Sequence, residues 1–109
     1  MSQTIVEVTD ATFDQEVRES VKPVLVDFWA PWCAPCMALL PVLEALAATY
    51  ETELKFVKVN SDENPELVKR FGVRGVPQVF LVKDGAETVQ ALKERTRTRL
   101  SLELDALLA

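Results

Sequence analysis

Hydrophobic and charged residues alternate along short stretches of the chain, and this period of two predicts strands. The alternation occurs at residues 5–8 (IVEV) and again at residues 54–59 (LKFVKV). Residues 24–29 (VLVDFW) are apolar except for one aspartate and are bounded by prolines, a pattern typical of a strand that is covered on both faces. We expect this strand to lie at the centre of a sheet.

Apolar residues at helical spacing follow these strands. The segment led by Thr9 and Asp10, two good helix-capping residues, has apolar side chains four residues apart at positions 13 and 17. Residues 34–50 carry apolar side chains at spacings of three and four, which predicts the longest helix, and Pro41 within it predicts a kink.

Two further helices are predicted from their end signals. Asn64 offers a cap, Pro65 suits the first helical position, and Gly72 is a typical stop. Near the end of the chain, Thr96 or Thr98 opens a last helix whose leucines line one face.

An Asp-Gly pair between two apolar runs, residues 79–82 and 88–92, predicts an antiparallel hairpin. The resulting order is β α β α β α β β α. It implies one α/β domain over residues 1–109, with a central mixed sheet of about five strands flanked on both faces by about four helices. In such folds chemistry takes place beyond the carboxyl ends of the parallel strands.

Composition narrows the range of functions. The 109 residues are 49% hydrophobic and 27% charged, which is ordinary for a globular protein, and the net charge of -5 gives no reason to bind nucleic acid or anionic lipid. No apolar run reaches the roughly 20 residues that cross a membrane, and the first residues lack the pattern of a signal peptide. We expect a cytoplasmic protein with no membrane association.

The candidate chemistry lies in FWAPWCAPC, which contains the chain's only two cysteines, Cys33 and Cys36. A structural zinc site needs four Cys or His ligands and the chain has no histidine, so a metal would require sharing the pair with another chain or a small thiol. We therefore expect no metal. Both cysteines could be small buried apolar residues, but a Cys-x-x-Cys at a strand-to-helix junction favours redox chemistry.

Position at the start of a helix suits that chemistry. Unpaired N–H groups and the helix dipole would stabilise a thiolate at Cys33, and Pro35 fits a first turn that needs no N–H from it. Cys36 falls on the same helix face, within reach of a disulfide with Cys33. We expect Cys33, at the exposed helix end, to attack a target disulfide and the shielded Cys36 to resolve the mixed disulfide.

Asp27 is the second anomaly, since a carboxylate within VLVDFW must face solvent or be buried at a cost. Burial would raise its pKa and make it a candidate proton shuttle. A satisfied structural aspartate or a strand-edge surface residue are the alternatives. Lys58 in the neighbouring strand reads on its own as an outward-facing residue.

Several motifs of the chain, taken together, resemble those of a known protein family. VDFWAPWCAPC, Pro41, VKVNSDENPELVKRFGVRGVP and KDG occur in the order and spacing of the thioredoxin family, over essentially the whole chain. The resemblance implies a thioredoxin fold and a protein disulfide reductase in which Cys33 is the nucleophile and Cys36 the resolving thiol. It further implies that Asp27 is the buried acid or base that deprotonates Cys36, and that Lys58 tunes it.

The resemblance also implies a docking surface around the sulfurs. Pro77 would be a cis-proline that leaves the Val76 backbone free to pair with an extended target segment. Trp29 would support the active-site loop, and Trp32 would form part of a flat apolar patch. The implied target-binding residues are Trp29, Trp32, Ala34, Pro35, Gly75, Val76 and Pro77.

Three positions depart from the family pattern. Ala34 stands where glycine is typical, Gln78 follows the cis-proline where threonine is common, and Lys93 replaces a docking-surface glycine. Lys93 puts a charge at the rim of the patch and opens the segment KERTRTR, which is either a solvated face or a contact for an acidic partner.

The expected partners are disulfide-containing target proteins and a thioredoxin reductase that returns the disulfide to the dithiol. No cofactor is expected besides the redox-active pair, and we expect a monomer. Two alternatives stay open: a specialised family member that is more oxidising or narrower in its partners, and a binding module that uses the Trp32 patch without the thiols.

Overall fold

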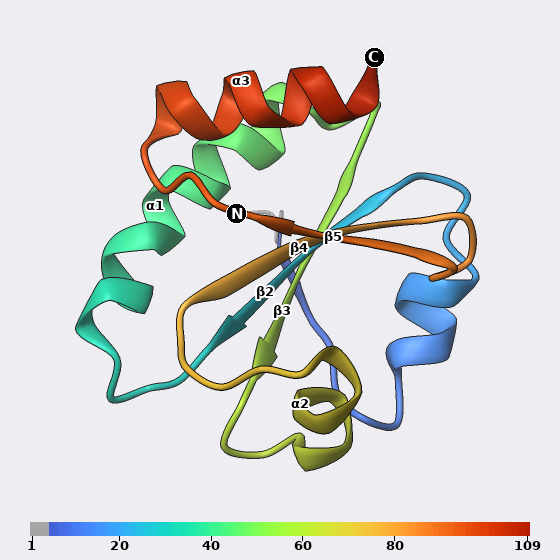
Figure 1. The fold of residues 1–109 in the computed structure, drawn as a ribbon, viewed down its shortest axis with the longest axis vertical. Coiled ribbons are helices and arrows are strands. Elements are labelled where there is room, and N and C mark those ends of the chain that lie inside the picture. Colours follow the sequence, from blue (N-terminus) through green and yellow to red (C-terminus); the bar gives the residue numbers. More distant parts are fainter. Residues whose placement is uncertain (1–4) are drawn as a thin grey trace.

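The computed structural model describes residues 5–109, and the predicted order of elements is confirmed (Figure 1). The first helical segment is a short π-helix, in which the Glu19 N–H donates to the Asp14 carbonyl. The elements are β1 (Ile5–Glu7), η1 (Asp14–Arg18), β2 (Val24–Trp29), α1 (Ala34–Thr49), β3 (Lys55–Asn60), α2 (Pro65–Phe71), β4 (Gln78–Lys83), β5 (Thr88–Leu92) and α3 (Arg97–Leu108).

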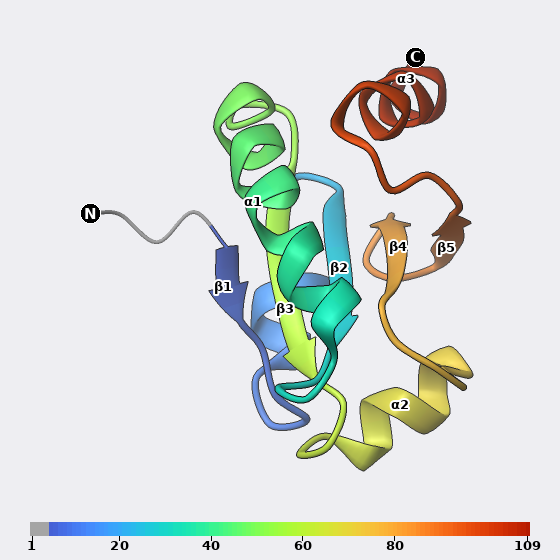
Figure 2. The same ribbon diagram turned by 90° about the vertical axis from the view of Figure 1, so that its left-hand side faces the viewer.

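The strands form one mixed sheet in the order β1-β3-β2-β4-β5. β2 runs parallel to β3 and antiparallel to β4, so the apolar strand is central, as its sequence predicted. β4 and β5 pair antiparallel around the predicted turn, whose residues Asp84, Gly85 and Ala86 all have positive φ. α1 lies in front of β2 and β3 in Figure 2.

Two apolar clusters hold helices to the two faces of the sheet. Leu25 of β2 packs with Leu39 and Leu43 of α1 and with Leu100 of α3. On the other face, the side chains of η1 and α2 pack against β2, β3 and β4, and four phenylalanine rings lie 5.1–5.8 Å from their neighbours. α1 and α3 therefore cover one face, and η1 and α2 cover the other.

The end signals of two helices are confirmed. Gly72 ends α2 in the left-handed conformation, with φ of 67°, which a glycine adopts without strain. Thr96 is the N-cap of α3, and its hydroxyl accepts from the Arg99 N–H at 3.2 Å. α1 continues through Pro41.

Of the two predicted caps, Thr9 bonds to the helical segment that follows it: its hydroxyl oxygen accepts from the Thr12 N–H at 3.3 Å, and its own N–H donates to Thr12 Oγ1 at 2.9 Å. Asp10 makes no such bond to this segment. The carboxylate of Asp10 instead accepts from the N–H groups of Glu66 and Leu67, at 3.2 and 3.0 Å, and so caps α2 from across the fold.

Asn64, predicted as the side-chain cap of α2, makes no such bond. Its amide oxygen accepts from the Asp10 N–H at 2.8 Å, and its amide nitrogen donates to the Asn60 carbonyl at 2.9 Å. Asp10 thus takes the capping role predicted for Asn64, because tertiary contact brings Asp10 to the start of α2. Among residues 5–109, no helix is both long and apolar enough to span a membrane.

Candidate active site

The two cysteines lie at the carboxyl end of β2, where α1 begins. Cys33 is the N-cap of α1, Pro35 is in its first turn, and Cys33 and Cys36 form a disulfide with Cα atoms 5.2 Å apart. The Cys36 N–H donates to the Cys33 Sγ at 3.2 Å. A backbone donor of the first helical turn is thus aimed at this sulfur, as a stabilised thiolate requires.

Cys33 is less exposed than the sequence suggested. Its exposed fraction is 4%, against 0% for Cys36, because Trp29 and Val76 pack against the pair. The expectation of an exposed nucleophile is therefore wrong for the disulfide form, in which each sulfur also covers the other. Cys33 keeps the outer position of the two.

Asp27 is completely buried, and neither of its carboxylate oxygens has a hydrogen-bond partner. Burial raises its pKa to about 7, although the charges of Arg95 and Lys58 oppose that rise. Side chains two apart on a strand share a face, so Asp27 lies on the face of Leu25, which α1 covers. The carboxyl group thus lies under the helix that carries both cysteines.

Lys58 shares that face as well. Glu7, Lys58 and Asp27 are in register on the adjacent strands β1, β3 and β2. The Lys58 ammonium lies 3.9 Å from a Glu7 carboxylate oxygen and 5.3 Å from the Trp29 ring centroid, and its side chain is half-buried. Lys58 is therefore a member of a charged row across the sheet and not a simple surface lysine.

Sequence reasoning missed two charged residues of this neighbourhood. Glu7 could have been found by aligning the alternation of the first and third strands. Arg95 belongs to the basic segment KERTRTR that the sequence singled out, but its place beside the disulfide had no signal, because the connection from β5 to α3 is irregular. Arg95 lines a pocket of about 220 Å³ together with Pro35, Ala38, Leu39 and Pro77, directly beside the disulfide turn.

The surface around the sulfurs contains the other predicted residues. Trp32 is 71% exposed, and its indole N–H donates to an Asp62 carboxylate oxygen at 3.0 Å, which fixes the ring. The Val76–Pro77 peptide bond is cis, as the resemblance implied. Gly75 is exposed, and a Cβ at this position would meet no atom within 4 Å.

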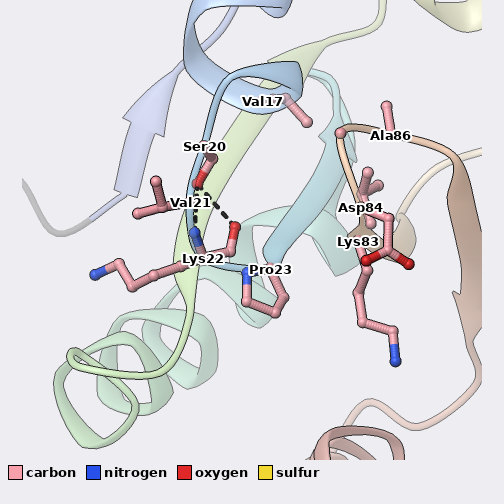
Figure 3. A pocket seen from close by; sticks show the side chains of 10 residues that line it. Val17, Ser20, Val21, Lys22, Pro23, Lys83, Asp84 and Ala86 are labelled. Carbon is pink, nitrogen blue, oxygen red and sulfur yellow. Dashed lines mark hydrogen bonds between the residues drawn. The ribbon is translucent and has the colours of Figure 1, made fainter.

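A second pocket, of about 170 Å³, lies at the opposite end of the sheet, between the segment before β2 and the hairpin turn (Figure 3). Its polar side chains are bonded within the protein. Ser20 bonds the backbone of Lys22, whose ammonium donates to the Glu51 carbonyl, and the Lys83 ammonium donates to the Leu107 carbonyl. The disulfide end is the better candidate site.

Within residues 5–109, no group of three or more His, Cys, Asp or Glu side chains is placed to hold a metal ion. The reactive groups at this end of the sheet are the two sulfurs and the buried carboxyl group. Together they provide a two-electron couple and a group that exchanges a proton near neutral pH.

A family model described as thioredoxin matches residues 4–106 of this chain. Thioredoxin 1 of Synechococcus elongatus is 48% identical over 98 residues, which cover 90% of this chain and 92% of that protein. Thioredoxin of Pseudomonas aeruginosa is 44% identical over 106 residues, which cover 97% of this chain and 98% of that protein. With a disulfide at the head of α1, this chain belongs to the thioredoxin family of thiol–disulfide oxidoreductases.

Proposed function

We propose that this protein reduces disulfide bonds of other proteins, with Cys33 as the attacking thiolate and Cys36 as the resolving thiol. The observation that carries the proposal is the Cys33–Cys36 disulfide at the start of α1, above a carboxyl group with no partner. In the dithiol form the same N–H that reaches Cys33 Sγ favours a thiolate there.

In the first step the Cys33 thiolate attacks one sulfur of the target disulfide. A bond forms between Cys33 and that sulfur, the target S–S bond breaks, and the second target sulfur leaves as a thiolate that takes a proton from water. The outer position of Cys33 makes it the sulfur that a target reaches first.

In the second step Cys36 loses its proton and attacks Cys33 Sγ. The Cys33–Cys36 disulfide forms, the mixed disulfide breaks, and the remaining target sulfur leaves as a thiolate that takes a proton from water. A carboxyl group with a pKa of about 7 exchanges protons at physiological pH, so Asp27 is our candidate to accept the Cys36 proton. Lys58 acts on Asp27 through its charge.

Target binding is assigned to the surface around the sulfurs. The exposed Trp32 ring, fixed by Asp62, supplies apolar area with little loss of side-chain entropy. The backbone of Val76 next to the cis bond at Pro77 is the proposed partner of an extended target segment. Trp29, Ala34, Pro35 and Gly75 complete the proposed surface.

We also propose that a thioredoxin reductase restores the dithiol, that no other cofactor takes part, and that the protein works as a monomer in the cytoplasm. A reducing protein suits a compartment in which thiols are kept reduced. Disulfide-containing target proteins are what membership of the family implies.

The test is reduction of insulin disulfides with NADPH and a thioredoxin reductase, or with dithiothreitol as the electron source. Wild type should turn over. Cys33→Ser and Cys36→Ser should both be inactive, and only Cys36→Ser should accumulate a mixed disulfide, because it keeps the nucleophile but cannot resolve the product.

Mixed disulfides that form on Cys36 when Cys33 is absent would reverse the assignment of roles. A Cys33→Ser protein that keeps full biological function would favour a thiol-independent binding module. If dithiothreitol supports turnover but the thioredoxin reductase does not, a specialised member of the family would be favoured.

A further inference from the structure

The strongest unassigned feature beside the disulfide is the guanidinium of Arg95. Its Nη1 donates to the carbonyls of Leu92, at 3.0 Å, and Glu94, at 2.9 Å. These two bonds hold the side chain against the end of β5, so its position is set by the backbone. Among residues 5–109, no carboxylate forms an ion pair with it.

The pocket that Arg95 lines is apolar on its other sides. Pro35 and Ala38 come from the first turns of α1, and Pro77 comes from the loop that packs next to the disulfide. A target segment that crosses the sulfurs and the cis-proline loop would pass this pocket. The side chain of a residue next to the target cysteine is of a size to enter it.

The surrounding charge is opposite in sign to that of the whole protein. Residues 93–99 carry four basic side chains, Lys93, Arg95, Arg97 and Arg99, and one acidic side chain, Glu94, and the Glu103 carboxylate accepts from the N–H groups of Lys93 and Glu94. This segment with Glu103 therefore keeps an excess of positive charge, while the chain as a whole carries a net charge of -5. The first turn of α3 contains no acidic residue. Arg95 is the one charged residue that lines this pocket, so an anionic group is attracted there chiefly by its guanidinium.

We propose, building on the disulfide reductase function above, that Arg95 selects target segments that carry a carboxylate side chain next to the attacked cysteine. The planar guanidinium, with N–H donors left over from its two backbone bonds, binds a carboxylate through two parallel hydrogen bonds. The apolar residues on the other sides of the pocket reduce the screening of that pairing by water. Arg95 is thus a specificity residue of the site, distinct from the sulfur chemistry.

The same charge acts on the proton acceptor beneath the site. The charge of Arg95 opposes the rise in the pKa of Asp27 more strongly than the charge of Lys58 does. A substitution at Arg95 can therefore change the rate on every target. For this reason the test compares two targets within each variant, so that any general change of rate cancels.

The experiment uses two disulfide-linked peptides that differ only in having Glu or Gln on both sides of one cysteine. The second-order rate of their reduction by the pre-reduced protein is measured at pH 7 and low ionic strength. Each Glu-to-Gln rate ratio is divided by the same ratio for dithiothreitol, which removes the effect of the glutamates on the peptide sulfur itself.

Wild type should prefer the Glu peptide by about threefold to fivefold, the range of a partly exposed ion pair. Arg95→Gln should bring the ratio to about one, and Arg95→Lys should give an intermediate value because it keeps the charge but loses the fork. Arg99→Gln removes the same charge from an exposed position outside the pocket and should keep the wild-type ratio. Salt should weaken the preference.

A wild-type ratio of one, or an unchanged ratio in Arg95→Gln, would overturn the inference and leave the reductase function intact. An equal fall in Arg99→Gln would also overturn it, since the preference would then come from the general field. Failure of wild type to reduce either peptide, while dithiothreitol reduces both, would overturn the proposed function itself. Circular dichroism of each variant checks that it is folded.

Discussion

The carboxyl group of Asp27 is buried without any of the partners that usually stabilise a buried charge. Its two oxygens accept no hydrogen bond, and Lys58, the residue in register on β3, directs its ammonium to within 3.9 Å of Glu7. Ionisation in such a place costs free energy. A group of this kind reduces stability above its pKa, which is consistent with a residue kept for chemistry.

Asp27→Ala should therefore stabilise the oxidised protein at alkaline pH. In the folded protein the pKa is about 7, against an ordinary value of 3.8, so the unfolded chain releases the proton first. The contribution of Asp27 to the free energy of unfolding is fully present below pH 3.8, where the carboxyl group is protonated in both states. It is lost as the pH rises through about 7, where the folded protein must bury the charge. Denaturant unfolding at pH 9 should show a gain on the order of 3 kcal/mol for the variant.

Near pH 5 the gain should vanish, or reverse slightly because of the small cavity that alanine leaves. Glu87→Ala, at an exposed carboxylate, is the control and should change stability by less than about 0.5 kcal/mol at either pH. A destabilised Asp27→Ala at pH 9 would mean that the carboxylate is favourably solvated, which would remove the argument for its role in proton transfer.

At the scale of elements, the hydrogen bonds between Asp10 and α2 connect two segments that lie far apart in the sequence. Asp10 follows β1, whereas α2 follows β3, the neighbour of β1 in the sheet. The bonds at the head of α2 hold the turn before η1 against the helix that precedes the cis-proline loop. The helix that leads to the cis-proline loop is thus capped by a residue from near the start of the chain.

Asp10→Ala should lower the free energy of unfolding by about 1 kcal/mol, the usual cost of an N-cap, with an unchanged denaturant slope. Asp10→Asn should restore only part of it, since its single amide oxygen can accept from one of the two N–H groups that Asp10 bonds. The matched control is Asp14→Ala, whose exposed carboxylate lies 3.8 Å from Arg18 in a pair of little worth. Equal losses in the Asp10 and Asp14 variants would argue against the cap.

The same elements show what sequence could and could not predict. Strand alternation, the glycine end of α2 and the Asp-Gly hairpin are local, and they were predicted correctly. Asp10 was correctly predicted to cap a helix, but the wrong helix was predicted. The N–H group of Glu66 that it bonds lies 56 residues away in the chain. The segment that contains Arg95 was singled out from the sequence, but the position of Arg95 beside the disulfide turn was not predicted, because it depends on tertiary proximity.

At the scale of the whole molecule, the disulfide is a small part of what holds the fold together. The two large apolar clusters lie on either face of the sheet, and neither contains a cysteine. The disulfide closes a loop between residues only three apart in sequence. This arrangement separates the redox couple from the core, so that the bond can open and close in every cycle.

Reduction of the disulfide should therefore lower the free energy of unfolding slightly and leave the protein folded. The entropy of closing so short a loop is worth about 2 kcal/mol, so denaturant unfolding with dithiothreitol should show a loss of this size or less. A variant with both cysteines changed to serine should be insensitive to dithiothreitol. By the closure of the thermodynamic cycle, the same free energy makes the disulfide harder to reduce in the folded chain than in the unfolded one. Loss of the fold on reduction would show that the bond is structural, because a carrier that unfolds in each turnover could not present the surface around Trp32 to its next target.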